Sequence, residues 1–183
     1  EIHGITDDEV KWSPSQRRAL ETLQVILQNL SLDYDVILAG QNIERYDVPI
    51  IKRILPGRFD SYPTLDTYTA ALRLFPDKEH KLGPWYEWYT GYKEVNAHDA
   101  AADCHMCAHI IGKLLVDTGK SIPELVEWME EPQLLTQMPF GKYKGVPVKQ
   151  VPKNYWNWIA QNFHEPHKDV ELTTCSILGK EVC

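Results

Sequence analysis

The chain has 183 residues, of which 43% are hydrophobic and 25% are charged, and its formal net charge is −7. This length suffices for one good core and a small appended module, and no apolar run is long enough to cross a bilayer, so we expect no membrane role. The negative charge argues against non-specific binding of nucleic acid over the whole surface, so any such binding must be local.

A buried strand is predicted at residues 36–39, which form a short apolar run. A polar turn follows this strand, and after it comes a helix that has Pro49 in its first turn. Asp47 therefore lies at a helix N-terminus, where free backbone N–H groups favour a carboxylate. Helix capping alone would account for Asp47, so the functional information lies in the surrounding motif.

A long helix is predicted at residues 99–118, and Asp103 falls on the same four-residue repeat as Cys107 and two later aliphatic residues. An unpartnered carboxylate on this apolar stripe would be costly. A divalent metal ion would satisfy Asp103 and would also explain His98 just before the helix. A salt bridge to a lysine or an arginine accounts for Asp103 equally well, so both explanations stay open.

Two of the four cysteines, Cys104 and Cys107, lie on this same helix, with His105 and His109 close by. Structural zinc sites usually draw their ligands from two elements, whereas these four side chains would splay around a single helix. We therefore interpret both cysteines as buried free thiols.

The C-terminal region combines cationic and aromatic residues between positions 138 and 163, a mixture that suits both phosphates and bases. The residues expected to contact nucleic acid are Lys142, Tyr143 and Lys144. The aromatic residues expected to pack into a small core are Tyr155, Trp158 and Phe163. Residues 119–137, with one short helix and Pro132, are predicted to connect this region to the preceding part of the chain.

Several segments together resemble the DnaQ-like exonucleases of the DEDDh type, which hydrolyse nucleic acid from the 3′ end. Residues 3–6 resemble the family's His-Gly-Ile-Thr turn, residues 42–47 its second exonuclease motif, and residues 98–103 its third. Residues 65–67, 70–74 and 81–83 match the spacing of the same core. The likeness covers about the first 118 residues. Further along, the Phe-Gly-Lys-Tyr-Lys-Gly turn that starts at Phe140 resembles the small C-terminal module of exonuclease X.

The resemblance implies an α/β fold: a ribonuclease H-like exonuclease core, with a mixed sheet flanked by helices and its first strands missing, plus a small C-terminal module. The expected domains are an N-terminally incomplete core at residues 1–118, a helical connector at 119–137 and the module at 138–183. It also implies a metal-dependent 3′-to-5′ exonuclease that releases nucleoside 5′-monophosphates from DNA ends.

Site residues carried over from the resemblance have distinct roles. His98 would be the general base that deprotonates the attacking water, Asp47 and Asp103 would bind metal, and Asn42 would contact nucleic acid. The implied cofactor is Mg²⁺ or Mn²⁺ in a two-metal site, and the implied partner is DNA with a free 3′ end. A protein partner in a replication, repair, recombination or integration complex, and a cytoplasmic location in a bacterial or phage-infected cell, complete these expectations.

One departure from the family is the Asp-x-Glu motif, which normally precedes the His-Gly-Ile-Thr turn and supplies two further acids. The chain begins at Glu1, directly before that turn, so we expect it to be part of a longer polypeptide. Asp7, Asp8 and Glu9 are interpreted as an acidic first helical turn or a solvated loop rather than as replacements. An alternative function is that of a catalytically incomplete exonuclease fold that serves as a platform for nucleic acid or protein.

Overall fold

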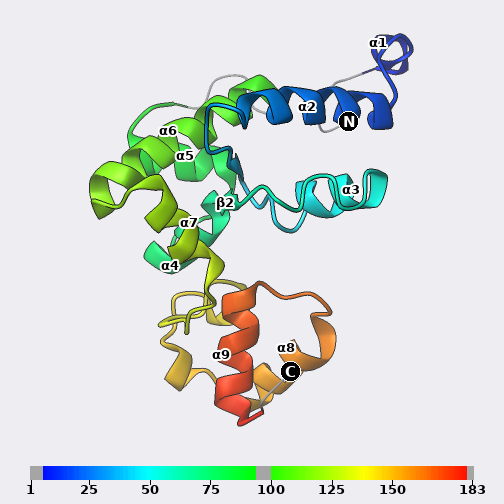
Figure 1. The fold of residues 1–183 in the computed structure, drawn as a ribbon. Coiled ribbons are helices and arrows are strands. Elements are labelled where there is room, and N and C mark those ends of the chain that lie inside the picture. The colour runs from blue at the N-terminus through cyan, green and yellow to red at the C-terminus, as the bar shows by residue number, and fades with distance from the viewer. Residues whose placement is uncertain (1–5, 94–99, 181–183) are drawn as a thin grey trace. The chain divides into compact units, whose positions relative to one another are not determined.

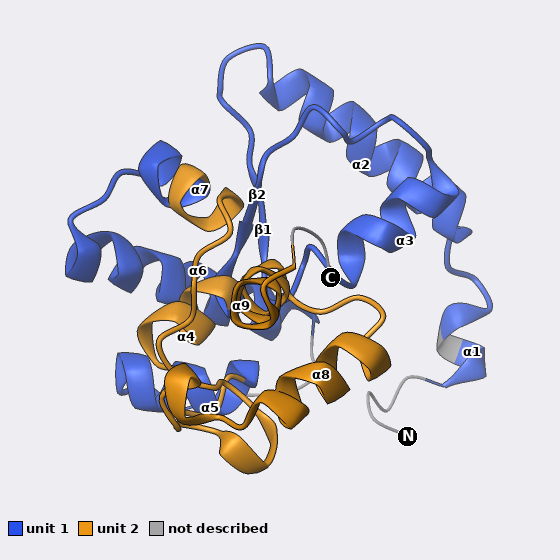
Figure 2. Cartoon of the chain, turned by 90° about the horizontal axis from the view of Figure 1, so that it is seen from below, with its two compact units in different colours: residues 1–68, 81–126 blue, residues 69–80, 127–183 orange. Residues whose placement is uncertain are grey.

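The computed structural model describes residues 6–93 and 100–180, which form helices and one small sheet (Figure 1). They divide into two compact units, which Figure 2 colours separately. Unit 1 contains residues 1–68 and 81–126, and unit 2 contains residues 69–80 and 127–183. The expected sequence modules at 1–118, 119–137 and 138–183 stay a prediction, and the spatial units differ from them because residues 69–80 group with the C-terminal region.

The sheet of unit 1 consists of two parallel strands, β1 (Leu38–Gly40) and β2 (Thr64–Asp66). Gly40 is in register with Asp66, so both strands end at the same edge of the sheet. The strand expected at residues 36–39 is present, but it begins two residues later and ends one residue later. A parallel pair beside helices confirms the α/β class.

The helices that lie wholly in unit 1 are α1 (Asp7–Val10), α2 (Gln16–Leu30), α3 (Asp47–Ile54), α5 (Leu82–Thr90) and α6 (Ala100–Thr118). Helices α2 and α3 flank an apolar cluster that is centred on Leu27, Leu55 and Phe59. Helix α5 packs on α6, where Trp85, Ile110 and Leu114 are fully buried. Helix α6 begins and ends within one residue of its prediction, because its apolar face repeats at helical spacing.

Two helices run from unit 1 into unit 2: α4 (Thr67–Leu74) and α7 (Ile122–Glu130). Unit 2 also contains the short 3-10 helices η1 (Gly141–Tyr143) and η2 (Val148–Gln150), and the helices α8 (Lys153–Asn162) and α9 (Lys168–Leu178). Helix α8 packs on α9, with Trp156, Ile159 and Val170 in the core between them. Among the described residues, no helix is both long enough and apolar enough to cross a membrane.

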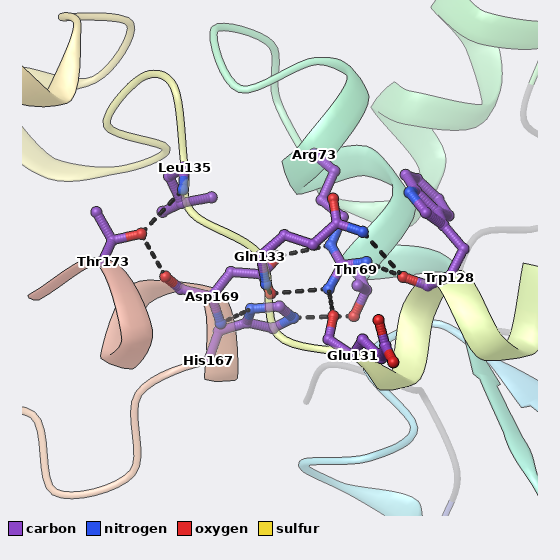
Figure 3. A network of polar contacts seen from close by, with 9 residues as sticks. All are labelled: Thr69, Arg73, Trp128, Glu131, Gln133, Leu135, His167, Asp169 and Thr173. Carbon is purple, nitrogen blue, oxygen red and sulfur yellow. Dashed lines mark hydrogen bonds and ion pairs between the residues drawn. The ribbon is translucent and has the colours of Figure 1, made fainter. Parts of the chain in front are cut away.

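A buried ion pair joins α4 to α9 within unit 2 (Figure 3). Arg73 donates from Nε to Asp169 Oδ2 at 2.6 Å and from Nη2 to Asp169 Oδ1 at 2.8 Å. Its remaining donors reach the carbonyl oxygens of Trp128 and Glu131, and the backbone N–H of Gln133 donates to Asp169 Oδ1 at 2.8 Å. The carboxylate is thus fully buried but fully hydrogen-bonded, which is the condition under which a buried charge is tolerated.

Candidate functional site

The candidate site of unit 1 lies at the edge where β1 and β2 end. Because the strands are parallel, the chain segments that follow Gly40 and Asp66 leave the sheet side by side. Asn42 turns the chain from β1 toward α3 with a φ of +59°, a left-handed conformation that asparagine adopts more readily than most residues. The second-motif loop at residues 41–46 is therefore built on the sheet edge.

Asp66 accepts hydrogen bonds from three backbone N–H groups, and two of them belong to this loop. Its Oδ1 accepts from Asn42 N at 2.7 Å and from Tyr68 N at 2.9 Å, and its Oδ2 accepts from Glu44 N at 3.3 Å. The Glu44 side chain in turn accepts from Thr64 Oγ1 at 3.1 Å, so Glu44 is attached to β2 at two points. The motif loop is thereby fixed to the strand that runs beside the one from which it departs.

The Asp66 side chain is only 1% exposed. Burial raises the pKa of this carboxyl from 3.8 to about 6, with a smaller contribution from the nearby charge of Glu44, although the three backbone hydrogen bonds oppose the rise. Sequence reasoning used Asp66 only for motif spacing. The signal that could have found its role is an acid in the last position of a short strand, where the loops of a parallel sheet meet.

Replacing Asp66 by Asn tests this arrangement. Because the folded-state pKa lies above that of an unfolded aspartate, the native protein binds the proton more tightly. Its stability should therefore fall as the pH rises from about 4 to about 6, by roughly 2–3 kcal/mol, and stay level above that range. Urea unfolding at several pH values should show this fall in the parent chain and not in Asp66→Asn. In NMR spectra, the amide signals of Asn42, Glu44 and Tyr68 should titrate together with one midpoint near 6; independent midpoints would contradict the geometry.

Helix α6 reaches the same edge through Cys107. Thr67 Oγ1 lies 3.2 Å from Gly40 O and 2.7 Å from Gln41 Oε1, and the Cys107 thiol is hydrogen-bonded to the Thr67 side chain and to the backbone of Gln41. Burial raises the pKa of the Cys107 thiol to about 11, so it stays neutral near pH 7. Asp103 lies one turn earlier on α6, and its charge acts on Cys107. The turn of α6 that carries Cys107 is therefore at the strand ends.

The predicted site residues lie in different surroundings. Asn42 lies in the loop held by Asp66, Asp47 is the exposed first residue of α3, and Asp103 is half-buried in α6. Within the described residues neither Asp47 nor Asp103 forms an ion pair, so the salt-bridge explanation of Asp103 finds no support there. His98 lies outside the described residues. The roles expected for these residues stay predictions.

The two cysteines of α6 differ from each other. Both are free thiols, and Cys107 is buried as expected, but Cys104 is exposed, so the expectation that both are buried was wrong for Cys104. The reason is helical geometry: Cys107 lies on the face that also buries Ile110 and Leu114, whereas Cys104 is turned away from that face.

In unit 2, Lys142 and Tyr143 lie in η1 and Lys144 directly follows it. Lys142 Nζ lies 4.9 Å from the centre of the Tyr143 ring and 5.7 Å from that of Tyr155. The aromatic residues expected to form a core do not do so: Trp158 is 45% exposed, Phe163 is 37% exposed, and Tyr155 is half-buried. The buried face of α8 carries Trp156 and Ile159 instead.

The mixed α/β arrangement, with a motif loop at the end of parallel strands and helix α6 in contact with that loop through Cys107, fits the ribonuclease H-like core of DnaQ-like nucleases. A family model described as "Exonuclease" matches residues 1–111, more than half of the chain. The chain belongs to this exonuclease family. A second family model, described as "Putative quorum-sensing-regulated virulence factor", matches residues 128–169, which lie in unit 2.

Two curated relatives are each named "Exodeoxyribonuclease 10", one from Escherichia coli strain K12 and one from Escherichia coli O6:H1. Each is 26% identical to the chain over 82 residues, an alignment that covers 43% of this chain and 37% of the relative. No solved structure matches the chain. The likeness of residues 138–183 to the module of exonuclease X stays a prediction.

Proposed function

We propose that the protein containing this chain is a metal-dependent 3′-to-5′ exodeoxyribonuclease that releases nucleoside 5′-monophosphates from DNA ends. Membership of the exonuclease family supports hydrolysis of nucleic acid, and the printed name of the two relatives supports DNA as the substrate. One local arrangement supports the proposal. The second-motif loop lies where β1 and β2 end, Cys107 of α6 is hydrogen-bonded at the same loop, and Asp103 lies one turn before Cys107 on that helix.

Each site residue has a proposed task. Asp47 and Asp103 bind Mg²⁺ or Mn²⁺, which would stabilise charge on the reacting phosphate. His98 accepts a proton from the attacking water, a task for which an imidazole side chain is suited at neutral pH. Asn42, together with Lys142, Tyr143 and Lys144, contacts the nucleic acid. The proposed setting is the cytoplasm of a bacterial or phage-infected cell, with a protein partner from a replication, repair, recombination or integration complex.

The described residues fit a divalent cation only in part. Carboxylate oxygens are the donors that Mg²⁺ and Mn²⁺ prefer, and Asp47 and Asp103 both keep access to solvent. However, the described part of the chain contains no group of three His, Cys, Asp or Glu side chains that could hold a metal ion. We propose that the remaining ligands are the two acids of the family's first motif, which are not among the residues described above.

The test uses the full-length gene product and a single-stranded oligonucleotide labelled at either end. With Mg²⁺ or Mn²⁺, a 3′ label should be released at once as a mononucleotide, whereas a 5′ label should give a ladder of shortening fragments. Excess chelator and His98→Ala should both abolish release. A ladder that shortens from the 5′ end would contradict the proposed direction. Binding without any cleavage would favour the alternative, a catalytically incomplete platform for nucleic acid or protein.

A further inference from the structure

Unit 2 carries a positive segment on a negative chain. From Pro132 to His164 the sequence has no Asp or Glu, although the net charge of the whole chain is −7. The segment contains the four lysines Lys142, Lys144, Lys149 and Lys153, which are all exposed. Within the described residues none of them forms an ion pair. Their charge therefore remains available to an anionic partner.

Five aromatic rings follow one another in the same segment, and we call them the aromatic ladder. Its members are Phe140, Tyr143, Tyr155, Trp158 and Phe163. The ring centres lie 4.8 Å apart between Tyr143 and Tyr155, 5.5 Å between Tyr155 and Trp158, 5.6 Å between Trp158 and Phe163, and 5.3 Å between Phe163 and Phe140. None of the five side chains is buried. The ladder is thus a continuous aromatic surface rather than a small core.

The ladder is held in place by the structure around it. Tyr155 and Trp158 are one turn apart on α8 and stack at 19°, while Trp156 and Ile159 anchor the other face of that helix in the core. Gly141 has a φ of +68°, a conformation that other residues rarely adopt, and a Cβ there would meet the Tyr155 hydroxyl, so glycine allows the loop with Lys142 to approach this ring. The rings are therefore pre-organised for a ligand.

The combination of rings and lysines selects the class of ligand. Exposed lysines attract an anionic partner, and partly exposed rings can stack with flat apolar groups; a nucleic acid strand offers both. In a duplex the base faces are covered by their neighbours, whereas a single strand can present them to aromatic side chains. The positive segment ends beside Phe163, where Glu165 and Glu171 line the adjoining cavity. A bound nucleic acid strand would therefore lie along the aromatic ladder, near the lysines, and would end before these two glutamates.

We propose that the aromatic ladder binds single-stranded DNA by stacking bases on Trp158 and Phe163, while the exposed lysines contact the phosphates. The proposal deepens the proposed function, on which it rests for the choice of DNA. It gives a binding role to Trp158 and Phe163, whose exposure is not explained by packing in a core. It also implies that unit 2 binds a part of the single strand other than the 3′ end that is proposed to be cleaved.

The test measures binding of a fluorescent oligothymidine to the full-length protein by anisotropy, with chelator present so that no cleavage occurs. Trp158→Ala should weaken binding about 5- to 150-fold, the range expected for the loss of one stacked base, and Trp158→Phe should restore most of it. The matched control is Trp88→Ala, which removes another exposed tryptophan from α5 in unit 1 and should leave binding unchanged. Because Trp158 is exposed, Trp158→Ala and Trp158→Phe should both keep the parent's thermal unfolding midpoint.

Three results would overturn the proposal: unchanged binding by Trp158→Ala, equal weakening by Trp88→Ala, or equal affinity for a blunt duplex of the same length. A parallel cleavage assay with Mn²⁺ separates this proposal from the proposed function. If Trp158→Ala weakens binding but the parent protein does not cleave, only the proposed nuclease activity is refuted. If the parent protein cleaves but Trp158→Ala binds as well as the parent, only the proposed DNA binding by the aromatic ladder is refuted.

Discussion

Replacing Asp103 by Asn is expected to lower the release of mononucleotides by the full-length protein by about a hundredfold or more. The substitution keeps the size and shape of the side chain but removes the negative charge that we propose binds a divalent cation. The stabilisation that such an ion gives to a transition state is worth several kcal/mol, and each 1.36 kcal/mol is a factor of ten in rate. The affinity for Mn²⁺, followed by electron paramagnetic resonance, should fall in parallel.

Asp117 provides the matched control, because it is an exposed acid near the other end of α6. Its carboxylate is paired with Lys113, with 3.0 Å between Lys113 Nζ and Asp117 Oδ2. Asp117→Asn should keep both nucleotide release and Mn²⁺ affinity. Normal metal binding by Asp103→Asn would contradict the role of Asp103. A loss of release with normal metal binding would assign Asp103 to positioning the substrate instead.

Removing one partner of the buried pair between Arg73 and Asp169 should destabilise unit 2 by about 3–5 kcal/mol. In Arg73→Met, the Asp169 carboxylate would keep its bond from Gln133 N but would lose its cation in a place that water does not reach. The carbonyl oxygens of Trp128 and Glu131 would lose their donors as well. Urea unfolding monitored by tryptophan fluorescence measures the change, since Trp128 and Trp156 both belong to unit 2.

The exposed pair between Lys113 and Asp117 again provides the comparison, and Lys113→Met should change stability little because solvent screens the pair. Replacing both Arg73 and Asp169 by apolar residues should not restore the parent's stability, because Gln133 N and the two carbonyl groups would remain unsatisfied. A loss below about 1 kcal/mol in Arg73→Met would show that water reaches the pair after all.

Patterns that are local in the sequence predicted the framework of unit 1. The strand near residues 36–39 and the helix at 99–118 were found with small shifts at their ends, since a short apolar run and a helical repeat depend on neighbouring residues only. The order of the motifs also indicated the exonuclease family, which the match to residues 1–111 confirms. The exposure of Trp158 was missed, because aromatic composition alone does not tell which side of α8 faces the core.

By itself the sequence determined the family, the strand near residues 36–39, the long helix α6 and the order of the motifs, because each depends on short stretches of chain. Only the tertiary structure decided which residues cooperate over long separations. Asp66 meets the N–H of Asn42 across twenty-four positions through the parallel register of β1 and β2, and Arg73 meets Asp169 across ninety-six positions. Such pairings follow from how strands align and helices pack, and no local periodicity encodes them.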